Sequence, residues 1–272
     1  MSGQGNVQVS KFIASLTERQ RLILMAVFEF RYLSTAQFTR LLFGGTDTSE
    51  ATASRLARRE LARLRENGGL IQLEHRAGYR RESNRAHVYG IGPLGRRALE
   101  AMSGQGIPRG RTYQEPGGPF VEHTLAVSEV HVRIKEAERH GIFTVERFAG
   151  EPGAWRSYTG PQGTTAHLKP DAFLIASQGE FEDRWFIEVD LATERRGALE
   201  RKLGVYLSYF RSGIEQATTG VFPRVIWMVP DPARRQFMED IIEKLGAPEG
   251  LFTVTETSHA IETLAGGEDR HG

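Results

Sequence analysis

Three carboxylates in the second half of the chain have the spacing of a site that binds a cation. Glu188 and Asp190 alternate with apolar residues in "FIEVDLATE" at positions 186–194. Side chains two residues apart on a strand point to the same face, so both acids share one environment. The preceding apolar segment, "KPDAFLIAS", carries a third acid, Asp171, directly after a proline.

A short polar connection, "SQGEFED", predicts that these two segments form an antiparallel pair. Folding the pair about Glu180 and Phe181 places Asp171 nearly opposite Asp190, with Glu188 one pleat along. Close carboxylates raise one another's pKa values, so the cluster implies a cation, a shared proton or basic partners. Oxygen-only ligands favour Mg²⁺ or Mn²⁺, and such an ion could polarise a phosphodiester and activate a water. We therefore predict a metal site formed by Asp171, Glu188 and Asp190.

Two further charged side chains could complete a catalytic set with these acids. A helix predicted over residues 194–210 places Glu194 and Lys202 on one side, two turns apart. We expect this helix to direct both groups to the strand ends, where Lys202 could stabilise charge on a phosphate. Lys169 is a competing candidate for that lysine.

Other interpretations of the acidic residues stay open at this stage. Glu122 or Glu129, on an earlier predicted helix, could supply a further ligand. Acids at alternating strand positions also mark the solvent face of a half-buried sheet, which is the common structural explanation. A nuclease-like fold that has lost its activity and only binds DNA is a third interpretation.

The elements that would position this site follow one another in an informative order. Hydrophobic periodicity predicts a helix, three strands, a helix and a strand, followed by a further helix and a short strand. Their ranges are 120–141, 142–148, 170–177, 184–192, 194–210, 224–229, 232–246 and 251–256. The helix-strand-strand-strand-helix-strand order is that of the core of restriction-endonuclease-like nucleases.

The first half of the chain differs sharply in charge from the second. Residues 1–115 carry 18 Lys and Arg against 10 Asp and Glu, a net +8, whereas the other 157 residues carry 17 against 24, a net −7. Arginine supplies all but one of the basic residues in the first half. Because guanidinium groups suit phosphates and guanine edges, this half is a candidate for nucleic-acid binding.

Local sequence signals predict three helices and a hairpin in this basic half. Capping boxes at Thr17 with Gln20, and at Ser34 with Gln37, predict the first two helix starts. A longer arginine-rich helix over 49–67 ends at a Gly-Gly pair, and two alternating stretches, 70–75 and 87–91, flank a basic tip.

This order is the plan of a winged helix-turn-helix, in which the third helix enters the major groove and the hairpin lies along the backbone. The expected DNA contacts are Thr52, Arg55, Arg58, Arg59 and Arg63 on the helix, and Arg80, Arg81 and Arg85 in the hairpin tip. The structural alternative for the helix arginines is a solvated face with local pairing to Glu60 and Glu66.

These signals divide the chain into a winged helix-turn-helix domain at 1–102, a Gly- and Pro-rich linker at 103–119 and a nuclease-like domain at 120–272. The fold class is thus α/β in the broad, α+β sense. There is no cysteine, which excludes disulfides, thiolate metal sites and a cysteine nucleophile. No segment near the start resembles a signal peptide or is long enough to span a bilayer, so a cytoplasmic location without membrane contact is expected.

The motifs also resemble known families. Asp171 in "KPDAFLIAS" and Glu188 in "WFIEVDLATE" are similar to the two acids of the PD-(D/E)xK nuclease signature, although Asp190 stands where that signature has lysine. Over roughly residues 15–245 the chain more closely resembles the replication-relaxation family of plasmids and integrative elements. That resemblance implies a role in plasmid replication and DNA relaxation.

The sequence therefore predicts a DNA-binding protein of a mobile genetic element, acting in replication, relaxation or conjugation by metal-dependent nicking or holding of DNA at an origin-like site. The alternative is a winged-helix transcriptional regulator or relaxase adaptor whose nuclease-like domain is inactive. Double-stranded DNA is the expected partner. Replication or conjugation proteins and a second copy of the chain are further partners that the sequence leaves open.

Overall fold

The computed structural model describes residues 2–45, 48–73, 87–104, 117–160 and 163–266. It confirms a mixed α/β fold. The chain forms two compact units, Met1–Val132 and Arg133–Gly272. Most of the predicted linker, residues 105–116, lies outside the described residues. Within the described part of the chain, no helix is long and apolar enough to cross a membrane.

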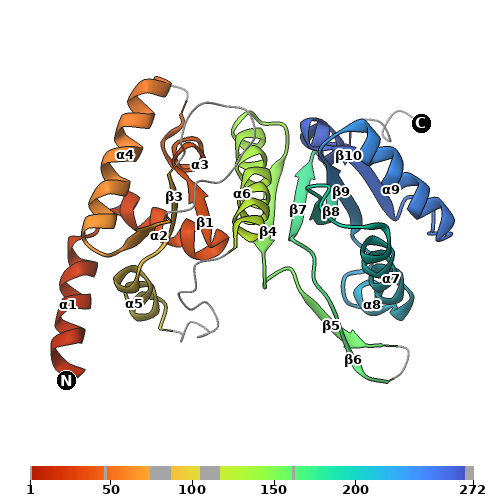
Figure 1. Cartoon of the computed structure of the whole chain (residues 1–272), viewed down its shortest axis with the longest axis horizontal. Helices are drawn as coiled ribbons and strands as arrows, with labels where there is room; N and C mark the ends of the chain where they lie inside the picture. The colour runs from red at the N-terminus through yellow and green to blue at the C-terminus, as the bar shows by residue number, and fades with distance from the viewer. Residues whose placement is uncertain (1, 46–47, 74–86, 105–116, 161–162, 267–272) are drawn as a thin grey trace. The chain divides into compact units, whose positions relative to one another are not determined.

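The first unit is mainly helical and contains a small sheet (Figure 1). Strand β3 is central in this sheet and pairs antiparallel with both β1 and β2. The elements are α1 (Ser2–Ser15), α2 (Glu18–Phe30), β1 (Tyr32–Ser34), α3 (Thr35–Phe38) continued by a π-helical turn (Thr39–Phe43), α4 (Glu50–Glu66), β2 (Leu70–Gln72), β3 (Val88–Ile91) and α5 (Pro93–Ser103).

The predicted helix starts in this unit are confirmed by their caps. At the start of α2, the Gln20 N–H donates to Thr17 Oγ1 over 3.2 Å and the Thr17 N–H donates to Gln20 Oε1 over 3.1 Å. The same reciprocal bonds join Ser34 and Gln37 before α3. Because each cap satisfies backbone donors that the first helical turn leaves unpaired, local sequence was sufficient to place these starts.

Helix α5 lies very close to the backbone that leads into β2. A Cβ atom built on Gly95 would lie 2.1 Å from the Gly69 carbonyl oxygen, and one on Gly92 would lie 2.3 Å from that of Gly68. Only glycine permits such a close approach of two backbones. The two glycines therefore hold α5 against the end of α4 and the start of β2, which keeps the small sheet in place.

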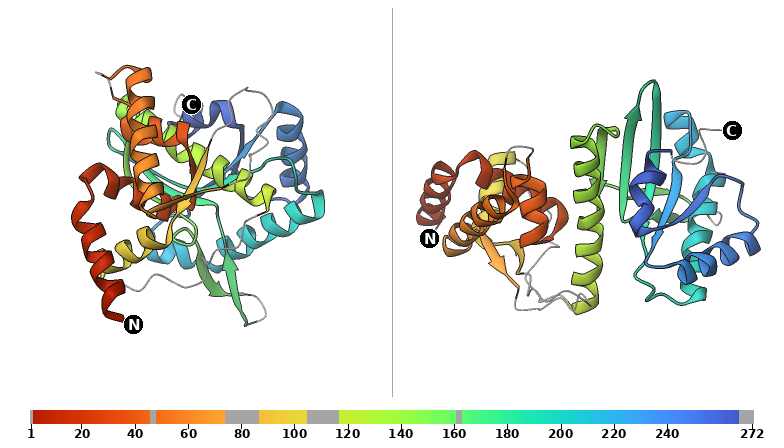
Figure 2. Two further views of the ribbon diagram at one scale, coloured as in Figure 1. Left: turned by 60° about the vertical axis from the view of Figure 1, so that its left-hand side comes forward. Right: turned by 90° about the horizontal axis from the view of Figure 1, so that it is seen from above.

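The second unit is a five-stranded sheet with helices (Figures 1 and 2). Helix α6 (Gly118–Arg139) leads into it from the first unit. The other elements are β4 (Thr144–Gly150), β5 (Arg156–Thr159), β6 (Thr165–Leu168), β7 (Ala172–Gln178), β8 (Phe181–Val189), α7 (Arg196–Ser212), α8 (Ile214–Thr219), β9 (Arg224–Val229), α9 (Pro232–Lys244), β10 (Phe252–Glu256), a 3₁₀ turn (Thr257–His259) and α10 (Ala260–Leu264).

The strand order in this sheet is β10-β9-β8-β7-β4. Strand β7 pairs antiparallel with β4 and β8, whereas β9 pairs parallel with β8 and β10. The main core lies between the sheet and helices α7 and α9, where Phe186 and Trp227 from the strands pack with Tyr206 and Ile241 from the helices. Because side chains on a strand alternate, the position two residues after Phe186 also faces α7. That position is Glu188.

A two-stranded hairpin, β5–β6, is inserted between β4 and β7 and extends away from the sheet (Figure 1). This hairpin was not predicted from the sequence. Its strands are only four residues long and lie in a stretch rich in Gly, Pro and Thr, which has the composition of a loop.

Candidate functional site

Glu188 is completely buried at the centre of the second unit. Its Oε1 accepts a hydrogen bond from the Tyr206 hydroxyl over 2.5 Å, and the Lys202 ammonium lies 2.5 Å from its Oε2. Tyr206 and Lys202 are four residues apart on α7, so both project from the same side of that helix. The site is thus one strand carboxylate held by two groups from one helix.

Asp171 directly precedes β7 and is 6% exposed. Its Oδ2 accepts a hydrogen bond from the Val189 N–H over 2.8 Å. Strands β7 and β8 pair Ala172 with Ile187, so Asp171 comes opposite Glu188 when that register is continued by one residue.

The predicted register, with Asp171 opposite Asp190, was therefore wrong by two residues. The turn is centred on Gly179 and Glu180, one residue earlier than expected, because Gln178 pairs with Phe181. Gly179 has φ 63°, which a tight two-residue turn requires and which glycine adopts without strain. A shift of two residues leaves every side chain on its face, so the two acids still meet.

Burial dominates the electrostatics of this cluster. It raises the pKa of Glu188 to about 8, against the effect of Lys202, and the Asp171 carboxylate raises this pKa further. Burial by itself would lower the pKa of Lys202, but the Glu188 and Asp171 carboxylates outweigh it and raise that pKa. The pKa of Tyr206 is also raised, by burial and by Glu188. One lysine therefore balances two acids, and the tyrosine stays a hydrogen-bond donor.

Asp190 lies just beyond β8 and faces a different partner. Its Oδ1 accepts from the Ala192 N–H over 2.7 Å, and its Oδ2 accepts from Arg234 Nε over 2.6 Å. Arg234, in the first turn of α9, also donates to the Glu194 carbonyl oxygen over 2.8 Å. Arg234 was not among the site residues predicted from the sequence. The parallel pairing of β8 and β9 was the signal that could have found it, because the segments after two adjacent parallel strands leave the sheet at the same edge.

The two candidate lysines lie in different places. Lys202 contacts Glu188, whereas the Lys169 ammonium lies 4.6 Å from the centroid of the Trp155 ring. Glu194 is exposed and precedes α7, so the helix predicted to start at Glu194 starts two residues later. Its charge still contributes to the raised pKa of Lys202.

The two glutamates considered on α6 belong to the first unit. Glu129 pairs with Arg40 and accepts a hydrogen bond from Gln37 Nε2 over 3.3 Å. It therefore serves contacts within that unit. Glu122 is half-buried on the same helix.

The carboxylates, as arranged, do not fit a divalent metal ion. Both oxygens of Glu188 and both oxygens of Asp190 lie beside donors of the protein itself. Among the residues that the structure describes, no group of three or more Asp, Glu or His side chains is placed to hold an ion together. A metal site would need these donors to be displaced.

The arginines of α4 fall into two groups. Arg59 and Arg63 lie 3.2 Å and 3.6 Å from the same carboxylate oxygen of Glu60, which is 6% exposed. By contrast Arg55 and Arg58 are exposed, and neither has an ion-pair partner within the described part of the chain. The local pairing expected as the structural alternative thus holds for Arg59 and Arg63 and not for Arg55 and Arg58.

The remaining predicted DNA contacts are less informative. Thr52 lies in the first turn of α4, where its Oγ1 accepts a hydrogen bond from Ser49 Oγ over 2.9 Å and its own N–H donates to that serine. Its role in the helix cap is therefore clear. Arg80, Arg81 and Arg85 lie outside the described residues.

Fold and site together define a two-unit α/β protein that joins an arginine-rich helical unit to a mixed-sheet unit with a buried carboxylate–lysine cluster. A family model described as replication-relaxation matches residues 24–225, about three quarters of the chain. The chain belongs to the replication-relaxation family, as its motifs suggested. No curated protein and no solved structure matches it. Membership of this family indicates a role in the replication or relaxation of a plasmid or similar element.

Proposed function

We propose that this protein binds duplex DNA through helix α4 and that it acts, at the DNA site it binds, in the replication or relaxation of a mobile element. The observation that carries the proposal is that Arg55 and Arg58 on α4 are exposed and have no ion-pair partner among the residues that the structure describes. Free guanidinium groups on a helix are the groups that bind phosphates and guanine edges. They lie in the part of the chain that carries a net charge of +8.

The arrangement of the first unit supports a winged helix-turn-helix as the DNA-binding element. Helix α4 is the last helix before β2 and β3, which pair as the two strands of a hairpin. In a winged helix, the helix at this position enters the major groove. Arg80, Arg81 and Arg85, in the sequence between these two strands, would then contact the DNA backbone.

Binding of the full chain to duplex DNA from its own replicon, as a function of salt, tests this proposal. Each phosphate that the protein neutralises makes the slope of log K against log salt steeper by about 0.9. For four to six phosphate contacts we expect the affinity to fall by roughly 100- to 1000-fold between about 50 and 200 mM salt. Affinity that is absent, or that does not change with salt, would contradict the proposal.

A second candidate function is nicking of DNA by the second unit, in a reaction that depends on Mg²⁺ or Mn²⁺. The observation in its favour is that Asp171, Glu188 and Lys202 meet at one place. These are two acids and a lysine, the residue types of the PD-(D/E)xK signature. The candidate requires the Lys202–Glu188 pair to open, because that pair and Tyr206 occupy the carboxylate. In this candidate, Asp190 and Glu194 would act at the edge of the site formed by Asp171, Glu188 and Lys202.

Conversion of supercoiled plasmid to open circles, with Mg²⁺ or Mn²⁺ added, tests the nicking candidate. If the full chain nicks, Asp171→Asn and Glu188→Gln should each slow the conversion by about 100-fold or more, roughly the least effect expected from removing a catalytic group. Glu243→Gln, at an exposed position on α9, is the matched control and should nick like the parent. Duplex binding without any nicking in either metal would reject this candidate and leave a protein that holds DNA.

A further inference from the structure

The β5–β6 hairpin presents an exposed indole in a stretch of chain without acidic residues. Residues 152–170 contain no Asp or Glu, although the 157 residues after position 115 carry a net charge of −7. Trp155 is 37% exposed, whereas the other two tryptophans, Trp185 and Trp227, are buried. The Trp155 ring, which could pack in a core, thus lies at the surface of a hairpin that has basic but no acidic side chains.

The pairing of the two strands separates an inner face from an outer face. Arg156 pairs with Leu168 and Tyr158 with Ala166, and Tyr158 and Leu168 are buried in the core that α7 covers. The alternate positions face outward and are all exposed. They are Trp155, Ser157, Thr159, Thr165, His167 and Lys169. The outer face therefore combines an aromatic ring, hydroxyl groups, a histidine and a lysine.

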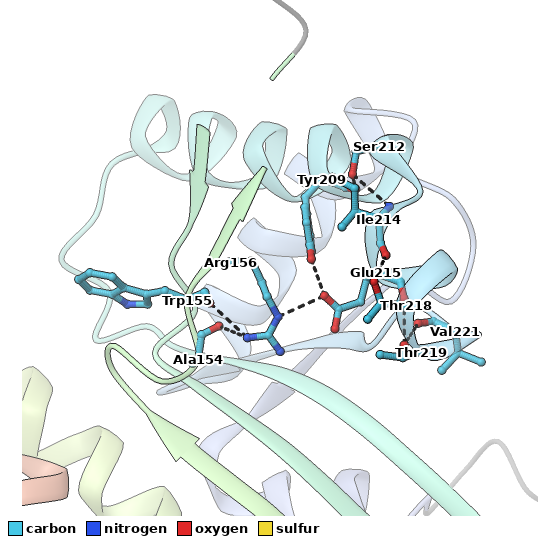
Figure 3. A network of polar contacts seen from close by, with 10 residues as sticks. All are labelled: Ala154, Trp155, Arg156, Tyr209, Ser212, Ile214, Glu215, Thr218, Thr219 and Val221. Atoms are coloured by element: carbon cyan, nitrogen blue, oxygen red, sulfur yellow. Dashed lines mark hydrogen bonds and ion pairs between the residues drawn. The ribbon is translucent and has the colours of Figure 1, made fainter. Parts of the chain in front are cut away.

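A buried charge network fixes the backbone from which Trp155 projects. Arg156 Nη1 donates to the carbonyl oxygens of Ala154 and Trp155, over 2.8 Å and 3.3 Å (Figure 3). Its Nε lies 3.1 Å from a carboxylate oxygen of Glu215, which also accepts a hydrogen bond from the Tyr209 hydroxyl. Figure 3 shows the Trp155 ring pointing away from this network. The indole is thus presented to solvent on a rigid base.

Lys169 places a positive charge beside the ring. Its ammonium lies 4.6 Å from the ring centroid of Trp155, at the end of the ribbon where both strands meet the sheet. Proteins that bind single strands combine aromatic rings, on which bases stack, with cations that contact the phosphates. Bases in a duplex are already stacked on their neighbours, so a partly exposed indole on this hairpin suits unpaired bases.

We propose that the outer face of the β5–β6 hairpin binds single-stranded DNA, with an unpaired base stacked on Trp155 and a phosphate at Lys169. The inference rests on the proposed function, since opening or relaxing a duplex produces such a strand. It assigns the second unit a contact that is separate from duplex binding by α4 and from the carboxylate cluster.

Intrinsic tryptophan fluorescence of the full chain tests this inference directly, because Trp155 is the exposed tryptophan. An oligothymidine of roughly 12 nucleotides, within the usual site sizes of single-strand binders, should quench the emission. We expect Trp155→Ala to weaken binding of that oligonucleotide about 5- to 100-fold, as loss of one stacked base does. Lys169→Ala should weaken it less and reduce the salt slope by about 0.7. Phe181→Ala and Lys244→Ala, at exposed positions elsewhere, are the matched controls.

The outcomes separate this inference from the proposed function. The inference is overturned if the oligonucleotide leaves the emission unchanged, if Trp155→Ala binds it like Phe181→Ala, or if a duplex quenches the emission equally well. Duplex binding measured in parallel should be unchanged in Trp155→Ala. Failure of the parent chain to bind any duplex would instead contradict the role of α4, whatever the single strand does.

Discussion

Replacing Lys202 with methionine should lower the free energy of unfolding by about 3 kcal/mol, because it leaves the buried Glu188 without its cation. This value is at the lower end of the range for breaking a buried ion pair, since the Lys202 side chain is 31% exposed. The Lys202 ammonium lies 5.4 Å from the centroid of the Trp227 ring. Methionine keeps most of the packing of the lysine chain against that ring. The loss therefore reports mainly the charge.

The loss should also depend on pH. In the folded protein the pKa of Glu188 is about 8, against an ordinary value of 4.5. Between these two values the folded state keeps a proton that the unfolded state has released, so this group makes stability fall as pH rises. Without Lys202 the folded pKa moves higher still. The variant should therefore lose more stability than the parent at about pH 9 and be closest to it at about pH 6.

Urea denaturation of both proteins at these two pH values measures the effect. Lys244→Met, at an exposed position, is the control for loss of one lysine. The double variant Lys202→Met with Glu188→Gln removes the buried charge as well, and should recover most of the stability. A Lys202→Met protein that matches the Lys244→Met control at both pH values would show that Glu188 does not depend on this pair.

The parts of the fold that the sequence predicted are those set by local signals. Capping boxes at Thr17 and Ser34 place helix starts because the cap and its partner are three residues apart. Periodicity also predicted the helix and strand segments that became α6, β4, β7, β8, α7 and β9, although the structure inserts the β5–β6 hairpin and α8 among them. The proximity of Lys202 to Glu188 could also be predicted from local order, because a helix that follows a strand packs back on it.

What the sequence could not predict depends on contacts between distant segments. The position of one turn residue, Gly179, decided the register of β7 and β8. The partner of Asp190 comes from α9, which is 44 residues further along the chain. The β5–β6 hairpin lacks an alternating apolar pattern because Arg156, one of its inward residues, is charged and is balanced by Glu215. Such pairs are visible only once the chain is folded.

These contacts also bear on what the second unit does. Each acid that the PD-(D/E)xK resemblance selects has a donor from the protein: Val189 for Asp171, and Lys202 with Tyr206 for Glu188. These internal contacts account for the cluster whether or not it ever reacts. Arg55 and Arg58 of α4 have no such ion-pair partner among the described residues, which is why the duplex-binding proposal rests on them.

The double variant Arg55→Ala with Arg58→Ala should weaken duplex binding roughly 100-fold, taking about 1–3 kcal/mol for each arginine that contacts a base edge or phosphate. Arg59 and Arg63 are poorer probes, because replacing them would leave the buried Glu60 with fewer donors and disturb the fold. Lys11→Ala with Arg21→Ala removes the same charge from exposed positions on α1 and α2, and is the matched control.

The salt dependence of the double variant distinguishes the two ways in which α4 could use these arginines. If Arg55 and Arg58 contact phosphates, the slope of log K against log salt should become shallower by about 1.8, and all sequences should be bound more weakly to the same extent. If they read base edges, the slope should stay near that of the parent and the preference for the cognate site should decline. Binding equal to that of the Lys11→Ala, Arg21→Ala control would remove α4 as the DNA-binding helix, because the control shares every charge effect except the position on that helix.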